Sequence, residues 1–311
     1  MDSTPFSPRI VSLLPAATEM AVALGLGDAL VGRSHECDHP PEVMRLPVLT
    51  APRIDASGSS RAIHDQVERA TAMFTLDAVQ LAALRPDVIL TQAACDVCAV
   101  AEADVAAAAR SLDPPPRIVS LSSTTLAGVF ADILAVGAAA GRLAKAREVV
   151  ARLQARCDSV ACRTRALAPA AGQPRVAMIE WLDPPMAAGN WVPEMVRLAG
   201  GDDVLGHAGE HSHWIGWDDV AAADPDVVVL VPCGFTLDRV LAEAASAAVR
   251  PHLESLRAFS QDRVWAVDGH HLFNRPGPRL VDSLEVLAEI VHPGTFAFAA
   301  TRPFARRLGR G

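Results

Sequence analysis

The chain has 311 residues, of which half are hydrophobic and 21% are charged, so it has room for two globular domains with sizeable cores. The net charge of −8 argues against nucleic acid as a partner, because phosphate binding needs a basic surface. The Arg-rich stretch 302–310 is too short and too local to change that conclusion.

The N-terminal residues do not have the pattern of a secretory signal. Met1–Pro8 carries an acidic residue and two prolines, with no basic region before an apolar stretch. The most apolar long segment, Leu126–Ala140, contains Asp132 and is shorter than a membrane span. We therefore expect a cytoplasmic protein that is not embedded in a membrane. In that compartment six cysteines are expected to be thiols or ligands rather than disulfides.

Strand and helix patterns alternate through the first half of the chain. Short apolar runs bounded by Pro, Gly or polar residues predict strands at Arg9–Leu14, Leu30–Ser34, Pro47–Leu49, Val88–Thr91 and Arg117–Leu121. Helical patterns are predicted at Ala16–Leu24, Ile63–Ala72, Leu76–Leu84, Cys95–Arg110 and Thr124–Gly141.

A single long helix is predicted over residues 142–167. Apolar residues recur there at steps of three and four, and charged residues fill the other faces. Gly141 ends the preceding helix, while Pro169 and Pro174 are expected to stop this one. At 1.5 Å per residue the helix would be roughly 39 Å long. A coiled-coil dimer is disfavoured, because the repeat stops before four heptads and its flanking charges are mostly positive.

The alternation resumes after this helix. Strands are predicted at Arg175–Glu180, Asp226–Val231 and Arg263–Val267, and helices at Trp191–Leu198, Trp217–Ala223, Thr236–Ser246 and Gly277–Val291. The pattern predicts an α/β fold with a helix-covered parallel sheet in each half. The expected organisation is an N-terminal lobe at 1–141, the connecting helix at 142–167, and a C-terminal lobe at 168–311 that ends in a short basic tail.

Unusual residues follow the carboxyl ends of the predicted strands, where open parallel sheets bind their ligands. These positions are Pro15 to Glu19, His35, Cys37, His39, Cys95, Cys98, Trp181, Cys233, His270 and His271. If the strand-end edges of the two lobes face each other, these residues line one cleft. The sequence contains no nucleophile elbow, Walker loop or H-E-x-x-H, so it offers no catalytic motif.

Five motifs give the chain a family resemblance. They are Arg9–Glu19 (RIVSLLPAATE), Asp38–Pro41 (DHPP), Leu84–Leu90 (LRPDVIL), Leu198–Val204 (LAGGDDV) and Arg275–Arg279 (RPGPR). In order and spacing they resemble the cobalamin- and siderophore-binding proteins of ABC importers, over roughly residues 9–292. The resemblance implies two Rossmann-like lobes bridged by a rigid helix, with little hinge motion and a ligand held between the lobes. Within that family the chain is most similar to the cobalamin binders.

A set of residues is predicted to contact a corrinoid or a related metal chelate: Pro15, Ala16, His35, Trp181, Trp191, His213, Trp214, His270, His271 and Arg275. For the tryptophans, core packing is the alternative to forming the apolar wall of a pocket. The resemblance also places the acidic residues that exported relatives present to their permease at Asp77 and Asp218. Simple capping of a helix N-terminus is the alternative for both.

The sequence differs from the cobalamin binders in three ways: it has additional cysteines, it has no export signal, and it has an apparent insertion at Ala51–Thr75. Cys37, Cys95, Cys98 and Cys233 are predicted to ligate zinc or an iron–sulfur cluster, with His35 or His270 able to replace one thiolate. A redox pair and plain packing are the alternatives for Cys95 and Cys98. Cys157 is expected in the core and Cys162 on the surface.

Two functions follow from these patterns. The first is non-enzymatic binding of a corrinoid, as in the substrate-binding proteins of ABC importers, with an ABC permease as the partner. The second is a cytoplasmic metal- or iron–sulfur-binding protein, which could be an enzyme, built on the same scaffold.

Overall fold

The structure is a computed structural model that describes residues 8–70, 72–92, 102–299 and 301–309. The chain forms two compact units. The first unit contains Met1–Ala56, Gln66–Ser123 and Ala127–Arg152, and the second contains Ser57–Asp65, Thr124–Leu126 and Leu153–Gly311. The units differ from the predicted lobes in one respect that matters below, because residues 57–65 belong to the second unit.

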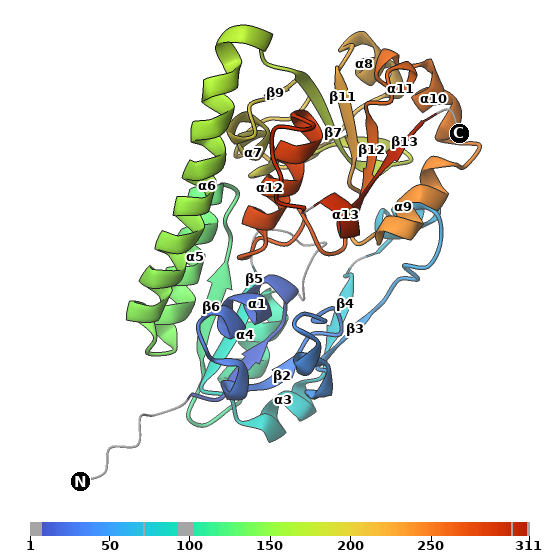
Figure 1. The fold of residues 1–311 in the computed structure, drawn as a ribbon. Coiled ribbons are helices and arrows are strands. Elements are labelled where there is room, and N and C mark those ends of the chain that lie inside the picture. Colours follow the sequence, from blue (N-terminus) through green and yellow to red (C-terminus); the bar gives the residue numbers. More distant parts are fainter. Residues whose placement is uncertain (1–7, 71, 93–101, 300, 310–311) are drawn as a thin grey trace. The chain divides into compact units, whose positions relative to one another are not determined.

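The first unit is built on a four-stranded parallel sheet (Figure 1). Its order is β2 (Leu30–Arg33), β1 (Ile10–Ser12), β5 (Val88–Gln92) and β6 (Arg117–Leu121). The central strands are short apolar runs buried on both faces, as expected where helices cover a parallel sheet. Val11, Ile89, Leu81 and Val105 form the core between this sheet and its helices.

The helices of the first unit begin and end where the sequence gives local signals. Helix α1 (Pro15–Ala23) begins with Pro15 in its first turn and is followed by Gly25 at φ +72°. Helix α3 (Ala78–Leu84) is capped by Asp77, and α4 spans Glu102–Arg110. Helix α5 (Leu126–Ala139) lies against the start of the long helix α6 (Leu143–Ala171). A Cβ at Gly137 would lie 2.5 Å from the Ala146 Cβ, so this close approach needs glycine.

The predicted insertion contains more structure than expected. Strand β3 is Thr50–Pro52 rather than Pro47–Leu49, and it pairs antiparallel with β4 (Phe74–Leu76). Leu76 therefore ends a strand, and the prediction that a helix begins there was wrong. Helix α2 (Ser60–Val67) lies between the two strands in sequence and begins and ends earlier than predicted.

The long connecting helix is confirmed, and it continues past its expected end. Helix α6 runs for 29 residues, roughly 44 Å, and includes Pro169. The prediction that Pro169 would stop the helix was wrong: its missing N–H removes one backbone hydrogen bond in the last turn, and the helix ends two residues later. Gly172, at φ +68°, follows the helix and supplies the left-handed residue typical of a helix end.

The second unit is built on a mixed sheet rather than a purely parallel one. Its order is β10, β8, β7, β11, β12 and β13, with β9 (Asp202–Asp203) also paired to β7. The parallel core consists of β7 (Arg175–Leu182), β11 (Val227–Leu230) and β12 (Val264–Val267). Strands β8 (Pro185–Ala187) and β10 (His213–Trp214) extend it antiparallel at one side.

The predicted basic tail is part of this sheet. Strand β13 (Ala305–Leu308) pairs antiparallel with β12 over four residues, and the Arg307 guanidinium lies 5.0 Å from the centre of the Trp265 ring. Ala305 is buried while Arg306 and Arg307 are exposed, and charged residues of this kind are common on an edge strand. The predicted short basic tail therefore includes a strand over this stretch.

Seven further helices complete the second unit. They are α7 (Val192–Leu198), α8 (Trp217–Ala222), α9 (Leu237–Ala244), α10 (Arg250–Ser255), α11 (Arg257–Ser260), α12 (Leu280–Val291) and α13 (Thr301–Phe304). Arg156 of α6 donates to Glu285 at 2.9 Å and to Asp282 at 2.6 Å, which fastens α12 to the second half of α6. Across the described residues, every helix is too short or too polar to cross a membrane.

Candidate functional site

The polar side chains at the strand ends of the first unit bond to one another across neighbouring segments. We call residues 12–19 and 34–38 the first rim. Thr18 donates to the Ser12 hydroxyl at 2.8 Å and lies 3.0 Å from the Cys37 sulfur. Ser12, Thr18 and Cys37 are fully buried. Pro15 is half-buried and Ala16 is buried, both in the first turn of α1.

His35 is held by Thr50, which β3 brings beside the first rim. The backbone N–H of His35 donates to the Thr50 hydroxyl at 3.0 Å, and the Nδ1 atom lies 2.6 Å from the same oxygen. Thr50 in turn donates to Ser34 at 2.9 Å. Burial and the nearby Arg33 charge lower the pKa of His35, so its ring is neutral at pH 7.

The strand ends of the second unit are organised around one buried carboxylate. We call Trp181, residues 232–235 and residues 268–275 the second rim. Asp268 follows β12, and its Oδ1 atom accepts from the N–H groups of His270 at 3.0 Å and His271 at 2.9 Å. Its Oδ2 atom lies 2.9 Å from the Nδ1 atom of His271. Burial acts to raise the pKa of Asp268, but the hydrogen bonds and charge of His271 outweigh it and lower that pKa.

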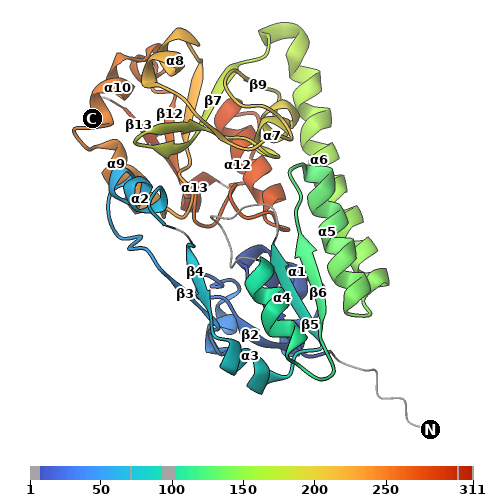
Figure 2. The same ribbon diagram turned by 180° about the vertical axis from the view of Figure 1, so that it is seen from behind.

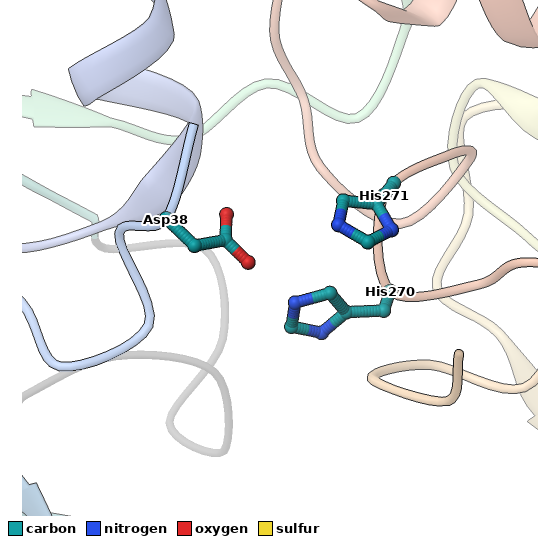
Figure 3. Close-up of side chains that lie close together, drawn as sticks. All are labelled: Asp38, His270 and His271. Carbon is teal, nitrogen blue, oxygen red and sulfur yellow. The ribbon is translucent and has the colours of Figure 1, made fainter. Parts of the chain in front are cut away.

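The two adjacent histidines of the second rim have different hydrogen bonds. Figure 3 shows both rings, which lie edge to face with centres 4.6 Å apart. The Nε2 atom of His270 is 3.1 Å from the Arg275 guanidinium. Because a guanidinium can only donate, His270 accepts at Nε2. An ionised carboxylate can only accept, so the Nδ1 atom of His271 donates to Asp268, and the other ring nitrogen, Nε2, faces away from this hydrogen bond.

Glycine and asparagine fix this loop against the neighbouring strand end. A Cβ at Gly269 would collide with the carbonyl oxygen of Pro232. The Asn274 amide donates to the carbonyl oxygens of Val231 at 3.1 Å and Gly269 at 2.9 Å. Only glycine allows this approach, so the position of the two histidines depends on it.

An aromatic wall continues the second rim. The Trp181 ring packs edge to face on Phe235, with centres 5.3 Å apart, and the Arg239 guanidinium lies 3.6 Å from the centre of the Phe235 ring. The carbonyl oxygen of Phe235 accepts from His270 N–H at 2.9 Å, so the wall and the histidine loop are directly joined. Trp181 lies within β7 rather than in the predicted loop.

The segment 57–65, which we call the arm, packs on this wall. Trp181 donates its indole N–H to the carbonyl oxygen of Ser60 at 3.2 Å. Ser60 is fully buried, and its N–H and hydroxyl both donate to Glu243 of α9, at 3.0 and 2.5 Å. Arg61 also forms an ion pair with Asp183. Figure 2 shows α2 beside α9 in this arrangement.

The other predicted tryptophan and histidine positions differ in exposure. Trp191 is buried and donates to the carbonyl oxygen of Phe273 at 2.7 Å, which places it in the core of the second unit. Trp214 is 53% exposed in β10, with the His64 ring of the arm packed edge-on at 4.7 Å. His213 stacks on His207 with ring centres 5.0 Å apart.

The predicted cysteine site stays a prediction. Cys37 is buried in the first unit, Cys233 is half-buried in the second, and Cys95 and Cys98 lie outside the described residues. As expected, Cys157 is buried and Cys162 exposed, and burial raises the pKa of the Cys157 thiol to about 11.

The two predicted docking carboxylates differ in their local role. Asp77 caps α3, because its side chain accepts from the Gln80 N–H at 2.8 Å. Asp218 is exposed in the first turn of α8, where Asp219 rather than Asp218 accepts from the Gly216 N–H. Capping therefore accounts for Asp77 and leaves Asp218 without that explanation.

A separate cavity of about 400 Å³ lies in the second unit beside α7. Thr125, Arg197, Asp203 and Gly209 are among its lining residues, and it contains none of the predicted ligand residues. Asp203 accepts from Leu205 N–H at 3.1 Å and Gly206 N–H at 2.8 Å through Oδ1, and burial raises its pKa to about 6. The aromatic and imidazole groups converge at the second rim instead.

Sequence reasoning missed Asp268 and the arm. The position of Asp268, directly after a strand and three residues before His271, is a signal that could have indicated it. The arm has no such signal, since its role depends on contacts with residues more than 100 positions away, such as Ser60 with Trp181 and Glu243.

The sequence profile of the periplasmic binding protein family matches residues 10–264, which is most of the chain. The chain belongs to this family. An uncharacterized ABC transporter substrate-binding lipoprotein of Bacillus subtilis is 24% identical over 299 residues, covering 93% of this chain and 81% of the lipoprotein. A vitamin B12-binding protein of Vibrio cholerae is 26% identical over 290 residues, covering 89% of this chain and 86% of that protein.

Solved structures show the same two-lobed fold. A periplasmic heme-binding protein from Pseudomonas aeruginosa has a TM-score of 0.74 and 22% identity, over 97% of this chain and 98% of that one. The periplasmic vitamin B12-binding protein of Vibrio cholerae has a TM-score of 0.65 and 22% identity, over 92% and 98%. The predicted family and the α/β two-lobe fold are confirmed, and the protein is a substrate-binding protein of the ABC-importer type.

Proposed function

We propose that this substrate-binding protein binds a corrinoid, and that the second rim supplies the main contacts. One observation carries the proposal: an aromatic wall, Trp181 on Phe235, is joined by a hydrogen bond to a loop that presents two imidazoles. A flat macrocycle needs an apolar wall of this kind, together with a few placed polar groups. The similarity to vitamin B12-binding proteins supports a corrinoid over other macrocycles.

The polar groups of the second rim match the periphery of a corrinoid. Arg275 is buried and carries a permanent charge, and its bond to His270 holds its guanidinium at the loop. Corrinoids carry amide side chains around an apolar ring system, so they need donors and acceptors next to apolar surface. Binding on the second rim requires no reaction and no further cofactor.

The experiment uses the purified full chain and three coloured probes: cyanocobalamin, cobinamide and haemin. Each is mixed with the protein, excess probe is removed by gel filtration, and the visible spectrum and the metal content are measured. We expect one retained corrinoid per chain. Retention of haemin without either corrinoid contradicts the proposal. Zinc or iron bound stoichiometrically by protein that retains no macrocycle would favour the predicted cysteine site instead.

We also propose that the protein delivers its ligand to an ABC permease and docks through Asp77 and Asp218. Asp218 carries more of this proposal, because its carboxylate is exposed and does not cap its helix. Reversing both charges should abolish binding to a co-expressed permease while the affinity for ligand is retained. A cytoplasmic location stays a prediction, and cell fractionation tests it.

A further inference from the structure

The pair formed by Asp268 and His271 has the arrangement of a prepared metal ligand. The carboxylate accepts a hydrogen bond from Nδ1–H, and in this tautomer the lone pair is on Nε2. Histidines that bind metals in proteins are commonly held in this way by a carboxylate, which fixes both the tautomer and the ring orientation. Among the residues that the structure describes, no hydrogen-bond partner lies on the Nε2 atom of His271.

The exposure of the two side chains and the hydrogen bonds of Asp268 also fit a prepared metal ligand. About a third of the His271 side chain is exposed (32%), whereas the Asp268 side chain is 9% exposed. Asp268 also accepts both backbone N–H groups of the loop, so the histidine is fixed through its main chain as well as its ring.

The neighbouring histidine does not have these features. The Nε2 lone pair of His270 is directed at Arg275, so binding a metal there would break a hydrogen bond to a buried guanidinium. The two adjacent histidines therefore differ in their hydrogen bonds: His270 accepts from Arg275 through Nε2, whereas His271 bonds Asp268 through Nδ1.

We infer that His271 coordinates the cobalt of the bound corrinoid through Nε2, with Asp268 as its positioning residue. The inference rests on the proposed function and adds a metal-ligand bond to it. In the exchange the cobalt–oxygen bond to a bound water breaks, a cobalt–nitrogen bond forms, and the water leaves. The cobalt keeps its oxidation state, and no proton is transferred.

Two cobalamins separate ligation from binding. In aquocobalamin the upper axial position holds an exchangeable water, and in cyanocobalamin a cyanide blocks it. We expect the full chain to bind both, to shift the visible bands of aquocobalamin only, and to bind aquocobalamin at least about 10-fold more tightly. In His271→Ala the band shift should be absent and the ratio of the two affinities should fall to about one. Added imidazole should restore the shift.

Two further variants make the result specific. Asp268→Asn keeps an acceptor for the backbone N–H groups but loses the carboxylate facing Nδ1, so it should keep a shift and lower the affinity ratio. The exposed His252, which stacks on Trp217, serves as control, and His252→Ala should behave as the natural chain. Circular dichroism and melting curves confirm that each variant is folded.

The outcomes separate this inference from the function on which it rests. A shift that persists in His271→Ala, or one that His270→Ala removes while His271 is intact, overturns the assignment of the ligand. Equal binding of both cobalamins without a shift overturns ligation and leaves corrinoid binding standing. Failure to bind either cobalamin overturns the proposed function itself.

Discussion

Both rims consist of segments that follow the carboxyl ends of strands, but the polar side chains of the two rims form different kinds of contact. In the first rim, Thr18 contacts Cys37 and His35 contacts Thr50 of β3, so these polar groups join segments of the first unit to one another. In the second rim, Asp268 holds the loop and bonds only the Nδ1 side of the His271 ring, and the loop is joined to the aromatic wall through the N–H of His270. Polar residues at a strand end therefore indicate a candidate site, and their bonding decides which of them are available to a ligand.

The largest effect is expected from breaking the second rim at Gly269. In Gly269→Ala the new Cβ meets the carbonyl oxygen of Pro232, and the backbone of the histidine loop must move. We expect a loss of about 3 kcal/mol in the free energy of unfolding, together with weaker ligand binding. Urea denaturation measures it. Gly27→Ala, where the nearest atom lies 3.9 Å away, is the control and should change stability by less than about 1 kcal/mol.

Asp203, which is half-buried, and Asp268, which is buried, should make contributions to stability that respond to pH in opposite directions. The pKa of Asp203 is raised to about 6, so its contribution is fully present below about pH 4 and is lost as the pH rises through 6. The pKa of Asp268 is lowered, so its contribution is present above its unfolded pKa and is lost on acidification.

Asp203→Asn isolates the first of these contributions. It should raise the free energy of unfolding at pH 7.5 by about 1–3 kcal/mol and leave it little changed at pH 4. Melting curves across this range measure the difference. Equal effects at both pH values would show that the raised pKa of Asp203 does not control stability.

Thr18→Val tests the claim that the first rim is structural. The variant keeps the volume of the side chain but removes the hydroxyl that bonds Ser12 and Cys37, so we expect a loss of about 1–2 kcal/mol. Ligand affinity should change much less than in Gly269→Ala. A large loss of affinity in a fully folded Thr18→Val protein would mean that the first rim also holds ligand.

The arm should have the smallest effect on stability and a clear effect on fluorescence. In Ser60→Ala, Glu243 loses the hydroxyl donor but keeps the N–H donor of residue 60, so about 1 kcal/mol is expected to be lost. Because the indole of Trp181 donates to the carbonyl oxygen of this residue, its emission should shift as the arm loosens. Ser57→Ala, in the same segment, is the comparison. An unchanged emission spectrum in Ser60→Ala would mean that the hydroxyl does not hold the arm against the wall.

The sequence allowed the parallel cores and the long helix to be predicted, because buried strands and a one-sided helix have strong periodic patterns. Strands β8, β10 and β13 were missed since strands of only two to four residues carry little pattern of their own. His270 and His271 were found from their place after a strand. The difference between them depends on Asp268 and Arg275, which only side-chain geometry reveals.

Equilibrium titration of the intact chain with cyanocobalamin, followed by tryptophan fluorescence or calorimetry, tests the central claim most directly. The second rim predicts binding of one molecule per chain and an affinity at least about 10-fold weaker in Trp181→Ala, because that variant removes half of the aromatic wall. Trp217→Ala, in a helix outside this rim, should bind as the natural chain does. Equal affinity of Trp181→Ala and the natural chain would contradict the assignment of the ligand to the second rim.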